Sequence, residues 1–258
     1  MTAFMPRRHL LAVVAASLFL CGPAAAQDAV IAPRPFVAEP ILHPIPRTAK
    51  PMKIGVIGSG NIGGTLGELA AKAGHTVMFS DRDPALSQGQ ANRVAGTRSG
   101  TGEEAIAFAD IVLVAIPFGA WPAVARQYGA ALRGKIVLET TNLNLARDGA
   151  QADAVIKKAG NTGDAVAGYL PGVKIVRAFN AAGYGAFAKQ AGRPGAKMAI
   201  PLAANDPQAM EAGTRLVTDL GFDAVPVGGG LAGSAKFELG GPAAGTKNAA
   251  ELKAAMGL

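Results

Sequence analysis

The sequence is poor in the side chains that most often carry chemistry. It has one cysteine, Cys21, and three histidines among 258 residues. A single cysteine cannot form a disulfide within the chain or build a cysteine-based metal site. Aromatic residues make up 5% of the chain, and its lysines and arginines are scattered, with no basic run. The formal charge of +7 therefore does not indicate a nucleic-acid-binding protein.

Candidate catalytic groups are also few. His9 and His43 fall in N-terminal segments, and His75 opens a predicted strand, where a structural role is the more common one. No spacing of His, Cys, Asp or Glu predicts a metal site, and no paired carboxylates appear. The sequence therefore names no catalytic residue, and we expect no bound metal. The remaining candidates for substrate contact are Tyr169, Tyr184, Lys236 and Glu238.

Residues 1–26 have the pattern of an export signal. A charged region at Arg7-Arg8 precedes an apolar stretch that is too short to span a bilayer, and Ala24-Ala25-Ala26 offers a cleavage site. The run from Arg7 to Leu11 also resembles a twin-arginine signal, and the sequence leaves this variant and an ordinary Sec signal equally open. We therefore expect a periplasmic protein with no stable membrane span. Residues 27–51 are rich in proline, which predicts a linker before the domain at 52–258.

The stretch from Met52 to Asp83 is the centre of the prediction. Its pattern indicates a strand, a glycine-rich turn, a helix that stops at Gly74, and a second strand at 76–79. The turn Gly58-Ser59-Gly60-Asn61-Ile62-Gly63 matches G-x-G-x-x-G directly after the first strand. An acidic residue, Asp81, follows the second strand, about 20 residues beyond the turn. This context predicts a dinucleotide-binding site.

Each glycine of the turn has a physical role in this interpretation. Gly58 permits the tight turn, Gly60 leaves room for a pyrophosphate, and Gly63 lets the helix pack closely on the strand. The helix N-terminus presents free N–H groups and the positive end of its dipole to the phosphates. A glycine-rich turn without any ligand is the alternative interpretation.

Strands and helices alternate along the rest of the chain. Further strands are expected at 110–117, 135–139, 174–179, 198–202 and 222–227, and helices are expected from 84, 101, 121 and 207. Residues 92–102 are expected to be irregular, and a short extension is expected to end in a helix near 249–256. The pattern predicts an α/β fold with a doubly wound, mostly parallel sheet, which is the Rossmann NAD(P)-binding fold.

In order along the chain, several stretches resemble the NADP oxidoreductases that depend on a deazaflavin coenzyme. These stretches cover about residues 52–240, and they are the glycine-rich turn, Ala115-Ile116-Pro117-Phe118, Thr141-Asn142, Val176-Arg177-Ala178-Phe179-Asn180, Asp219-Leu220-Gly221-Phe222 and Gly230-Leu231-Ala232. The resemblance implies hydride transfer between NADP(H) and a flavin-like, deazaflavin or other small acceptor. Pyrroline-5-carboxylate reductases share the first motif, but the chain after Gly240 is too short for their helical dimerisation domain.

The resemblance also implies which residues hold the cofactor. In the family, a hydroxyl and a guanidinium after the second strand hold the ribose 2′-phosphate, and Ser80 and Arg82 match these positions. Asp81 stands where the family usually has serine, and a carboxylate there suits the 2′-hydroxyl of NAD. NADP is therefore the expected cofactor, with NAD as an alternative. The glycine-rich turn, Ile116 and Pro117 complete the expected cofactor contacts, and Asn142 and Asn180 are expected near the nicotinamide.

Two functions remain open at the level of sequence. A hydride transfer between two cofactor-like rings needs mainly proximity, which agrees with the short list of catalytic candidates. The same short list also suits a non-catalytic NAD(P)-binding sensor or partner subunit. The sequence is compatible with a homodimer in either case.

Overall fold

The structure is a computed structural model that describes Met1 and residues 36–258. The expected export signal, Cys21 and the first part of the expected linker lie outside the described residues. The division into signal, linker and domain therefore stays a prediction. Within the described part of the chain, no helix is long and apolar enough to cross a membrane.

Eight strands form one sheet in the order β3-β2-β1-β4-β5-β6-β7-β8. Neighbouring strands are parallel, with one antiparallel pair, β6 and β7, among the described residues. This order confirms the predicted doubly wound, mostly parallel sheet. The strands are β1 (Lys53–Ile57), β2 (Thr76–Ser80), β3 (Arg98–Ser99), β4 (Ile111–Val114), β5 (Ile136–Glu139), β6 (Lys174–Arg177), β7 (Ala199–Ala204) and β8 (Asp223–Pro226).

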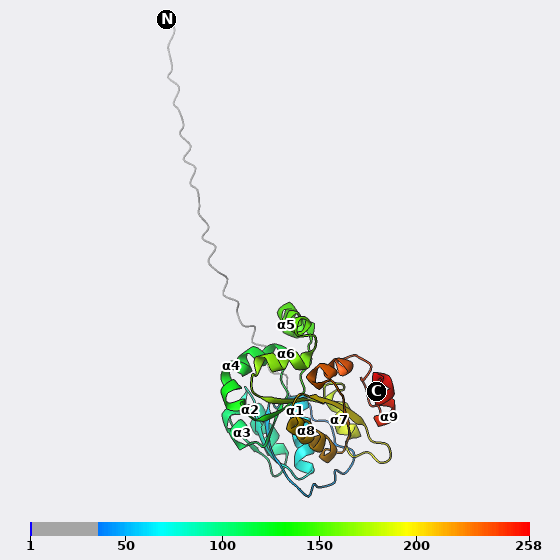
Figure 1. Cartoon of the computed structure of the whole chain (residues 1–258). Helices are drawn as coiled ribbons and strands as arrows, with labels where there is room; N and C mark the ends of the chain where they lie inside the picture. The colour runs from blue at the N-terminus through cyan, green and yellow to red at the C-terminus, as the bar shows by residue number, and fades with distance from the viewer. Residues whose placement is uncertain (2–35) are drawn as a thin grey trace. The chain divides into compact units, whose positions relative to one another are not determined.

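Helices cover both faces of this sheet (Figure 1). The α-helices are α1 (Asn61–Lys72), α2 (Pro84–Arg93), α3 (Gly102–Phe108), α4 (Trp121–Leu132), α5 (Leu145–Ala159), α6 (Thr162–Tyr169), α7 (Tyr184–Gln190), α8 (Pro207–Asp219) and α9 (Ala249–Met256). The described residues also form two 3-10 helices, η1 (Phe118–Ala120) and η2 (Gly230–Phe237). Helix α5 stands outermost, beyond α6 (Figure 1).

Side chains that alternate along the strands build a core on each face. On one face, Ile54 and Val56 of β1 belong to a cluster with Leu66 of α1 and Leu216 of α8. On the other face, strand residues such as Val112 pack with residues of α3, α4 and α6, among them Ile106, Trp121 and Val166. The central strands are therefore buried on both sides, which is why they read as continuous apolar runs.

The described part of the expected linker lies against the domain. Residues 36–51 contain no helix or strand, but Ile41 and Ile45 pack on the core next to α1 and α8. Leu42 N–H donates to Ala188 O over 3.4 Å, and Thr48 N–H donates to Ala73 O over 2.8 Å. These residues therefore form a strap across α1 and α7.

Several short elements differ from the sequence-based expectation. The stretch 92–102, expected to be irregular, begins with the end of α2 and contains the short strand β3. Helices α5, α6 and α7 were not predicted. Helix α5 is interrupted at Gly149, which has a φ of 79° that breaks the helical geometry. Such interruptions and frequent glycines weaken the helical period on which the prediction depends.

The C-terminal extension closes the far end of the sheet. Helix η2 runs beside β7, and α9 packs on β7 and β8, where Leu252 and Met256 join Val225 in a third small core. Asn248 caps α9, and Gly257 ends it in a left-handed conformation. The expected short extension is thus part of the folded domain.

Candidate functional site

The glycine-rich turn lies between the end of β1 and the start of α1. Gly58 has a φ of 92°, and a Cβ atom there would lie 2.5 Å from Ala115 O. A Cβ atom on Gly63 would clash with Gly58 O. A Cβ atom on Gly60, however, would meet no protein atom within 4 Å. The fold itself therefore requires Gly58 and Gly63, whereas the space beside Gly60 is open and suits a ligand.

The N-terminus of α1 faces this open space without a side-chain cap. Gly60 is the N-cap residue, and no described side chain accepts a hydrogen bond from the first turn. The first N–H groups of a helix then remain available, and the helix dipole favours a negative charge in front of them. The residues thus fit a pyrophosphate, which the backbone N–H groups of Asn61 and Ile62 would hold.

Neighbouring elements fix the turn in place before any ligand binds. The Ser59 hydroxyl donates to Ser80 O over 2.9 Å, and Gln90 of α2 donates to Ser59 O over 3.2 Å. The Asn61 side chain accepts from the backbone N–H of Val37 in the strap over 2.9 Å. A fixed turn loses little conformational entropy when it binds a ligand.

The residues after β2 lie directly beside the turn. Asp81 is partly buried, and its carboxylate accepts from Ser59 N–H over 2.7 Å and from Asp83 N–H over 3.0 Å. Arg82 is exposed. Ser80 is buried and its hydroxyl donates to Val56 O over 2.7 Å, so it faces into the sheet. Of the three residues expected at the ribose, Arg82 is thus exposed, Asp81 is partly exposed and Ser80 is buried.

Three further loops begin at the same edge of the sheet as the turn, where β4, β5 and β6 end. Ile116 and Pro117 follow β4, and both are half-buried. Asn142 follows β5, and its side-chain amide donates to Asn180 O over 2.8 Å. Asn180 follows β6, is fully buried, and donates to Phe237 O over 2.8 Å. The edge brings the expected residues together, and their contacts with a nicotinamide stay predictions.

A buried network of charges lies under this edge. Glu139 and Arg177 are register partners on β5 and β6, and their side chains are fully buried. Arg177 Nη1 lies 2.6 Å from Glu139 Oε2 and donates to Thr141 O over 2.8 Å. Arg177 Nη2 lies 3.0 Å from Glu238 Oε2. Both Glu238 oxygens also accept from Thr162, one from its N–H and one from its hydroxyl.

This network holds the loops at the edge in one arrangement. Glu139 Oε1 accepts from the Thr141 N–H and hydroxyl, and Trp121 donates to the same hydroxyl over 3.1 Å. Phe179, just before Asn180, has a φ of 59°, which is uncommon for a residue other than glycine. Such conformations concentrate where a loop must present a defined surface.

Sequence reasoning did not find this network as a unit. In the sequence, Glu238 is a candidate for substrate contact, Arg177 belongs to a stretch that resembles the family, and Glu139 ends an expected strand. A signal was present, because the expected strands at 135–139 and 174–179 each carry a charged residue near the carboxyl end, and the two charges are opposite. Only the pairing of β5 with β6 shows that they meet.

The other candidate residues lie in different places. His75 is buried, and its Nδ1 accepts from Met52 N–H over 3.1 Å, which agrees with the expected structural role. Lys236 donates to Met256 O, and Tyr184 begins α7. Tyr169 ends α6 and lies beside Phe118, with ring centroids 6.4 Å apart. Among the described residues no group of His, Cys, Asp or Glu could hold a metal ion.

Tyr169 and Phe118 line a hollow of about 170 Å³ beneath α5. Asp148 lies in the same wall and accepts from Gly119 N–H over 3.2 Å and from Asn144 N–H over 2.8 Å. Burial acts to raise the pKa of Asp148, but hydrogen bonds from Arg147 and from these two N–H groups outweigh it and lower the pKa. The carboxylate therefore ties the loop after β4 to the loop after β5.

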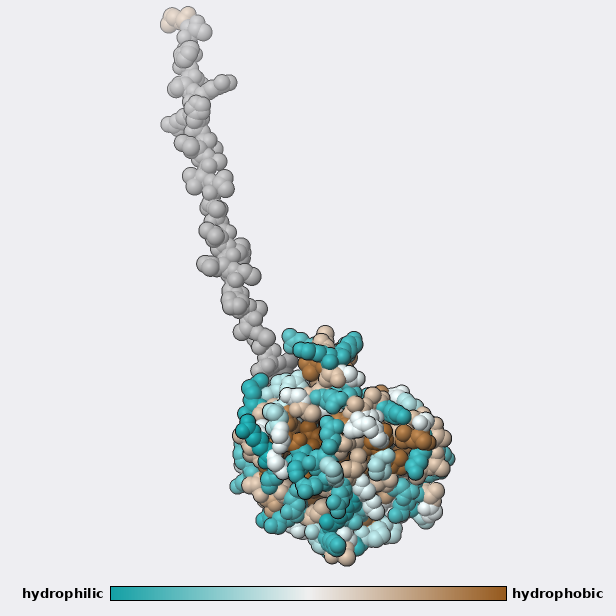
Figure 2. All heavy atoms as spheres, in the orientation of Figure 1, coloured by the Kyte–Doolittle hydropathy of each residue, from teal (hydrophilic) through white to brown (hydrophobic). Residues whose placement is uncertain are grey.

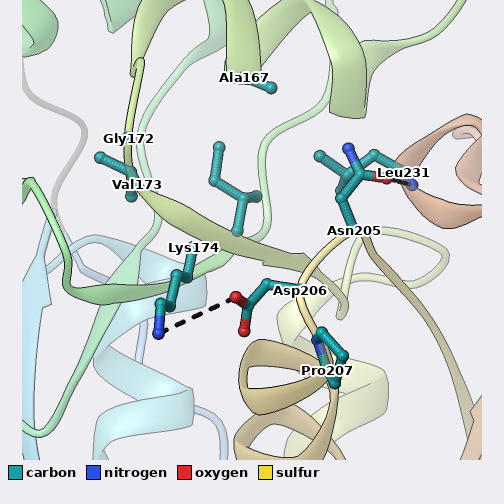
Figure 3. A pocket seen from close by; sticks show the side chains of 9 residues that line it. Ala167, Gly172, Val173, Lys174, Asn205, Asp206, Pro207 and Leu231 are labelled. Atoms are coloured by element: carbon teal, nitrogen blue, oxygen red, sulfur yellow. Dashed lines mark hydrogen bonds and ion pairs between the residues drawn. The ribbon is translucent and has the colours of Figure 1, made fainter.

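A larger cavity, of about 340 Å³, lies elsewhere on the domain (Figure 3). It is formed where β6 begins and β7 ends, between Val173, Lys174, Asp206 and Leu231. In Figure 3 the Lys174 ammonium points toward the Asp206 carboxylate, 3.9 Å away. None of its lining residues belongs to the glycine-rich turn or the residues after β2. It is therefore separate from the candidate dinucleotide site.

Comparison with known proteins gives a family match in the part of the chain that contains the glycine-rich turn. Residues 53–143 match the family described as NADP oxidoreductase, coenzyme F420-dependent. The match runs from β1 to the loop after β5, so it contains the glycine-rich turn and Asp81. It confirms the resemblance noted in the sequence for this half of the sheet. No curated protein matches the chain.

Several solved structures share the fold. A hypothetical protein from Sinorhizobium meliloti is 24% identical, with a TM-score of 0.64 over 78% of this chain and 95% of that chain. A protein from an Arthrobacter species, provisionally assigned as an F420-dependent NADP reductase, is 20% identical, with a TM-score of 0.58 over 72% and 87%. A 3-hydroxyisobutyrate dehydrogenase from Mycobacterium tuberculosis is 19% identical, with a TM-score of 0.50 over 72% and 57%. At these identities the likeness concerns the fold.

Proposed function

We propose that this protein is an NADP-dependent oxidoreductase that transfers a hydride to a flavin-like, deazaflavin or other small acceptor. The open space beside Gly60, in front of the uncapped start of α1, is the observation that carries the proposal. The match of residues 53–143 to a family of NADP oxidoreductases supports the cofactor and the class of reaction.

In this proposal, different residues bind the phosphate end and the nicotinamide end of the dinucleotide. The N–H groups at Asn61 and Ile62 hold the pyrophosphate, and Arg82 binds the 2′-phosphate of the ribose. The loops after β4, β5 and β6 surround the ring end, where a bound nicotinamide supplies the hydride. Buried side chains beneath these loops keep them in place, so that ring and acceptor meet with little loss of entropy.

The proposed reaction does not need a histidine at this edge. When a hydride moves from one ring to the other, the reduced acceptor can take up its proton from water. Positioning of the two rings is therefore the main contribution of the protein. One observation favours the alternative of a non-catalytic NAD(P)-binding protein. Asn142, Asn180 and Arg177 are all engaged with protein groups, which leaves few polar side chains for a substrate.

Rapid mixing of NADPH-loaded protein with a panel of acceptors separates the two functions. The proposal expects loss of the NADPH absorbance at 340 nm with at least one flavin or deazaflavin, faster than in a protein-free control. Tight NADPH binding without oxidation by any acceptor would favour the non-catalytic role. Light scattering of the same sample tests the expected homodimer.

The N-terminal sequence adds a proposal about location. We infer that the protein is exported with its dinucleotide already bound, because the medium outside the cytoplasm does not renew free NADPH. Retention for an hour requires a dissociation constant below roughly 1 nM at an association rate of ~10⁶ M⁻¹s⁻¹. Mature protein from a periplasmic extract should keep bound nicotinamide after dialysis. Protein that is empty after dialysis and binds NADPH at micromolar concentrations would contradict retention.

A further inference from the structure

We propose that the Glu238 carboxylate makes this site bind the oxidised nicotinamide in preference to the reduced one. The inference rests on the proposed function, since it concerns the ring end of the same dinucleotide. It assigns to the C-terminal extension a role in setting the direction of hydride transfer.

The proposal begins with the charges in the buried network. Glu139 and Arg177 form a close pair, at 2.6 Å, with both side chains fully buried. Glu238 is a second carboxylate on the same guanidinium, at 3.0 Å. Two carboxylates thus share one cation, and the network carries a surplus negative charge.

Neighbouring groups reduce this surplus without cancelling it. The Thr162 N–H, at the start of α6, donates to Glu238, so the helix dipole offsets part of the charge. The Arg147 guanidinium donates to Asn142 O over 3.0 Å, but it also pairs with Asp148 at 2.7 Å, so this pair adds no net charge beside Asn142. Asp164, in the first turn of α6, adds a further negative charge. Lys236, two residues before Glu238, directs its ammonium to Met256 O at the end of α9. The charged side chains that contact one another in the network, Glu139, Arg177 and Glu238, therefore have a net negative charge.

The network is separated from the expected ring position by a single side chain. Asn142 follows β5 at the edge where dinucleotides bind in such sheets. Its Oδ1 atom lies 3.4 Å from Arg177 Nη2, the same nitrogen that contacts Glu238. Asn142 is partly exposed, whereas Arg177 is fully buried behind it. A ring next to Asn142 would therefore feel the surplus charge.

The oxidised and reduced nicotinamides differ by one positive charge on the ring. A nearby negative charge attracts the oxidised form and leaves the neutral reduced form almost unaffected. The Glu238 side chain is 32% exposed, so water screens part of this attraction. We expect a preference of about threefold to tenfold, and a tenfold preference lowers the two-electron potential of the bound couple by about 30 mV. Hydride donation to the acceptor is then favoured over hydride uptake.

The test measures the dissociation constants of NADP⁺ and NADPH for the full chain and for Glu238→Gln. Glutamine keeps the length and one of the two accepting oxygens but removes the charge. The ratio of the NADP⁺ constant to the NADPH constant should rise about threefold to tenfold. If both constants change by the same factor, or if neither changes, the proposal is wrong. If the unmodified protein binds neither form, the proposed function itself fails.

Three further variants separate charge from structure. Glu238→Asp keeps the charge but shortens the side chain, so its ratio should stay near the unmodified value even if the domain is less stable. Glu211→Gln removes one carboxylate from the exposed surface of α8 and should leave the ratio unchanged. Leu239 is 58% exposed, so Leu239→Lys adds a charge with little cost to folding and should raise the ratio even if Glu238→Gln does not fold. An unchanged ratio in Leu239→Lys would contradict the proposal.

Discussion

The backbone N–H of Ser59 donates to Asp81 Oδ2 over 2.7 Å, so the glycine-rich turn and the end of β2 are held together. The same carboxylate accepts from Asp83 N–H, which fixes its orientation. In the proposed site, Asp81 would therefore support the pyrophosphate end and border the ribose end. We therefore propose that Asp81 and its neighbour Arg82 decide the choice between NADP and NAD.

Replacing Arg82 with alanine should weaken the binding of NADPH and leave the binding of NADH almost unchanged. A hydrogen bond between a guanidinium and a phosphate contributes about 1.5–3 kcal/mol. Titration calorimetry with both cofactors measures the difference directly. Equal losses for NADPH and NADH would show that Arg82 does not bind the 2′-phosphate.

Asp81→Ser should shift the preference further toward NADPH. The substitution removes a carboxylate that repels a 2′-phosphate and accepts from a 2′-hydroxyl. Because Asp81 also holds Ser59, both cofactors should lose some affinity, with NADH losing more. A greater loss for NADPH than for NADH would contradict this assignment.

Replacing only one member of the buried pair of Glu139 and Arg177 should lower the unfolding free energy of the domain. Arg177→Met leaves the Glu139 carboxylate buried without its cation, which costs about 3–5 kcal/mol of unfolding free energy. The double variant Glu139→Leu with Arg177→Met removes both charges and should recover much of this loss. Urea unfolding of the single and double variants measures the coupling. Additive losses would show that the two side chains do not act as a pair.

The buried His75 should make the domain less stable in mild acid. Burial lowers the pKa of His75 from its ordinary value of 6.5, and Arg215 acts in the same direction, while Asp219 partly opposes them. Below pH 6.5 the unfolded chain therefore binds a proton that the folded domain resists. Stability should fall as the pH drops from 6.5 toward the folded-state pKa, by at most about 1.4 kcal/mol per pH unit.

His75→Asn tests this contribution, because the asparagine oxygen can still accept from Met52 N–H but does not titrate. Urea unfolding at pH 7.5 and 5.5 should show a smaller decrease for the variant than for the unmodified protein. The same decrease in both proteins would show that other groups cause the acid sensitivity.

The first half of the sheet could be predicted well from the sequence, because short-range contacts and burial determine which residue types occur there. Gly58 and Gly63 are required by contacts within the turn, and the apolar runs of β1 and β4 follow from burial on both faces. Helix α5 was missed because Gly149 interrupts its period. The charge network was missed because Glu139 and Glu238 lie far apart in the chain. Only the packing of η2 beside β7 and α6 brings Glu238 to Arg177.

Less could be predicted from the sequence about the surface of the domain than about its core. Figure 2 shows hydrophilic residues spread over the visible face, with hydrophobic residues in areas between them. The strap at residues 36–51 was expected to be a linker because prolines exclude a helix, but proline content does not predict whether a segment packs on a domain.

Gly60→Val tests the central claim most directly, since a side chain there would fill the space assigned to the pyrophosphate. The backbone at Gly60 has a φ of −70°, and its Cβ would meet no protein atom within 4 Å, so the variant should fold normally. Calorimetry should show a loss of more than about 3 kcal/mol in NADPH binding, with the melting temperature of the free protein unchanged. Unchanged NADPH affinity in the folded variant would contradict the assignment of this turn as the dinucleotide site.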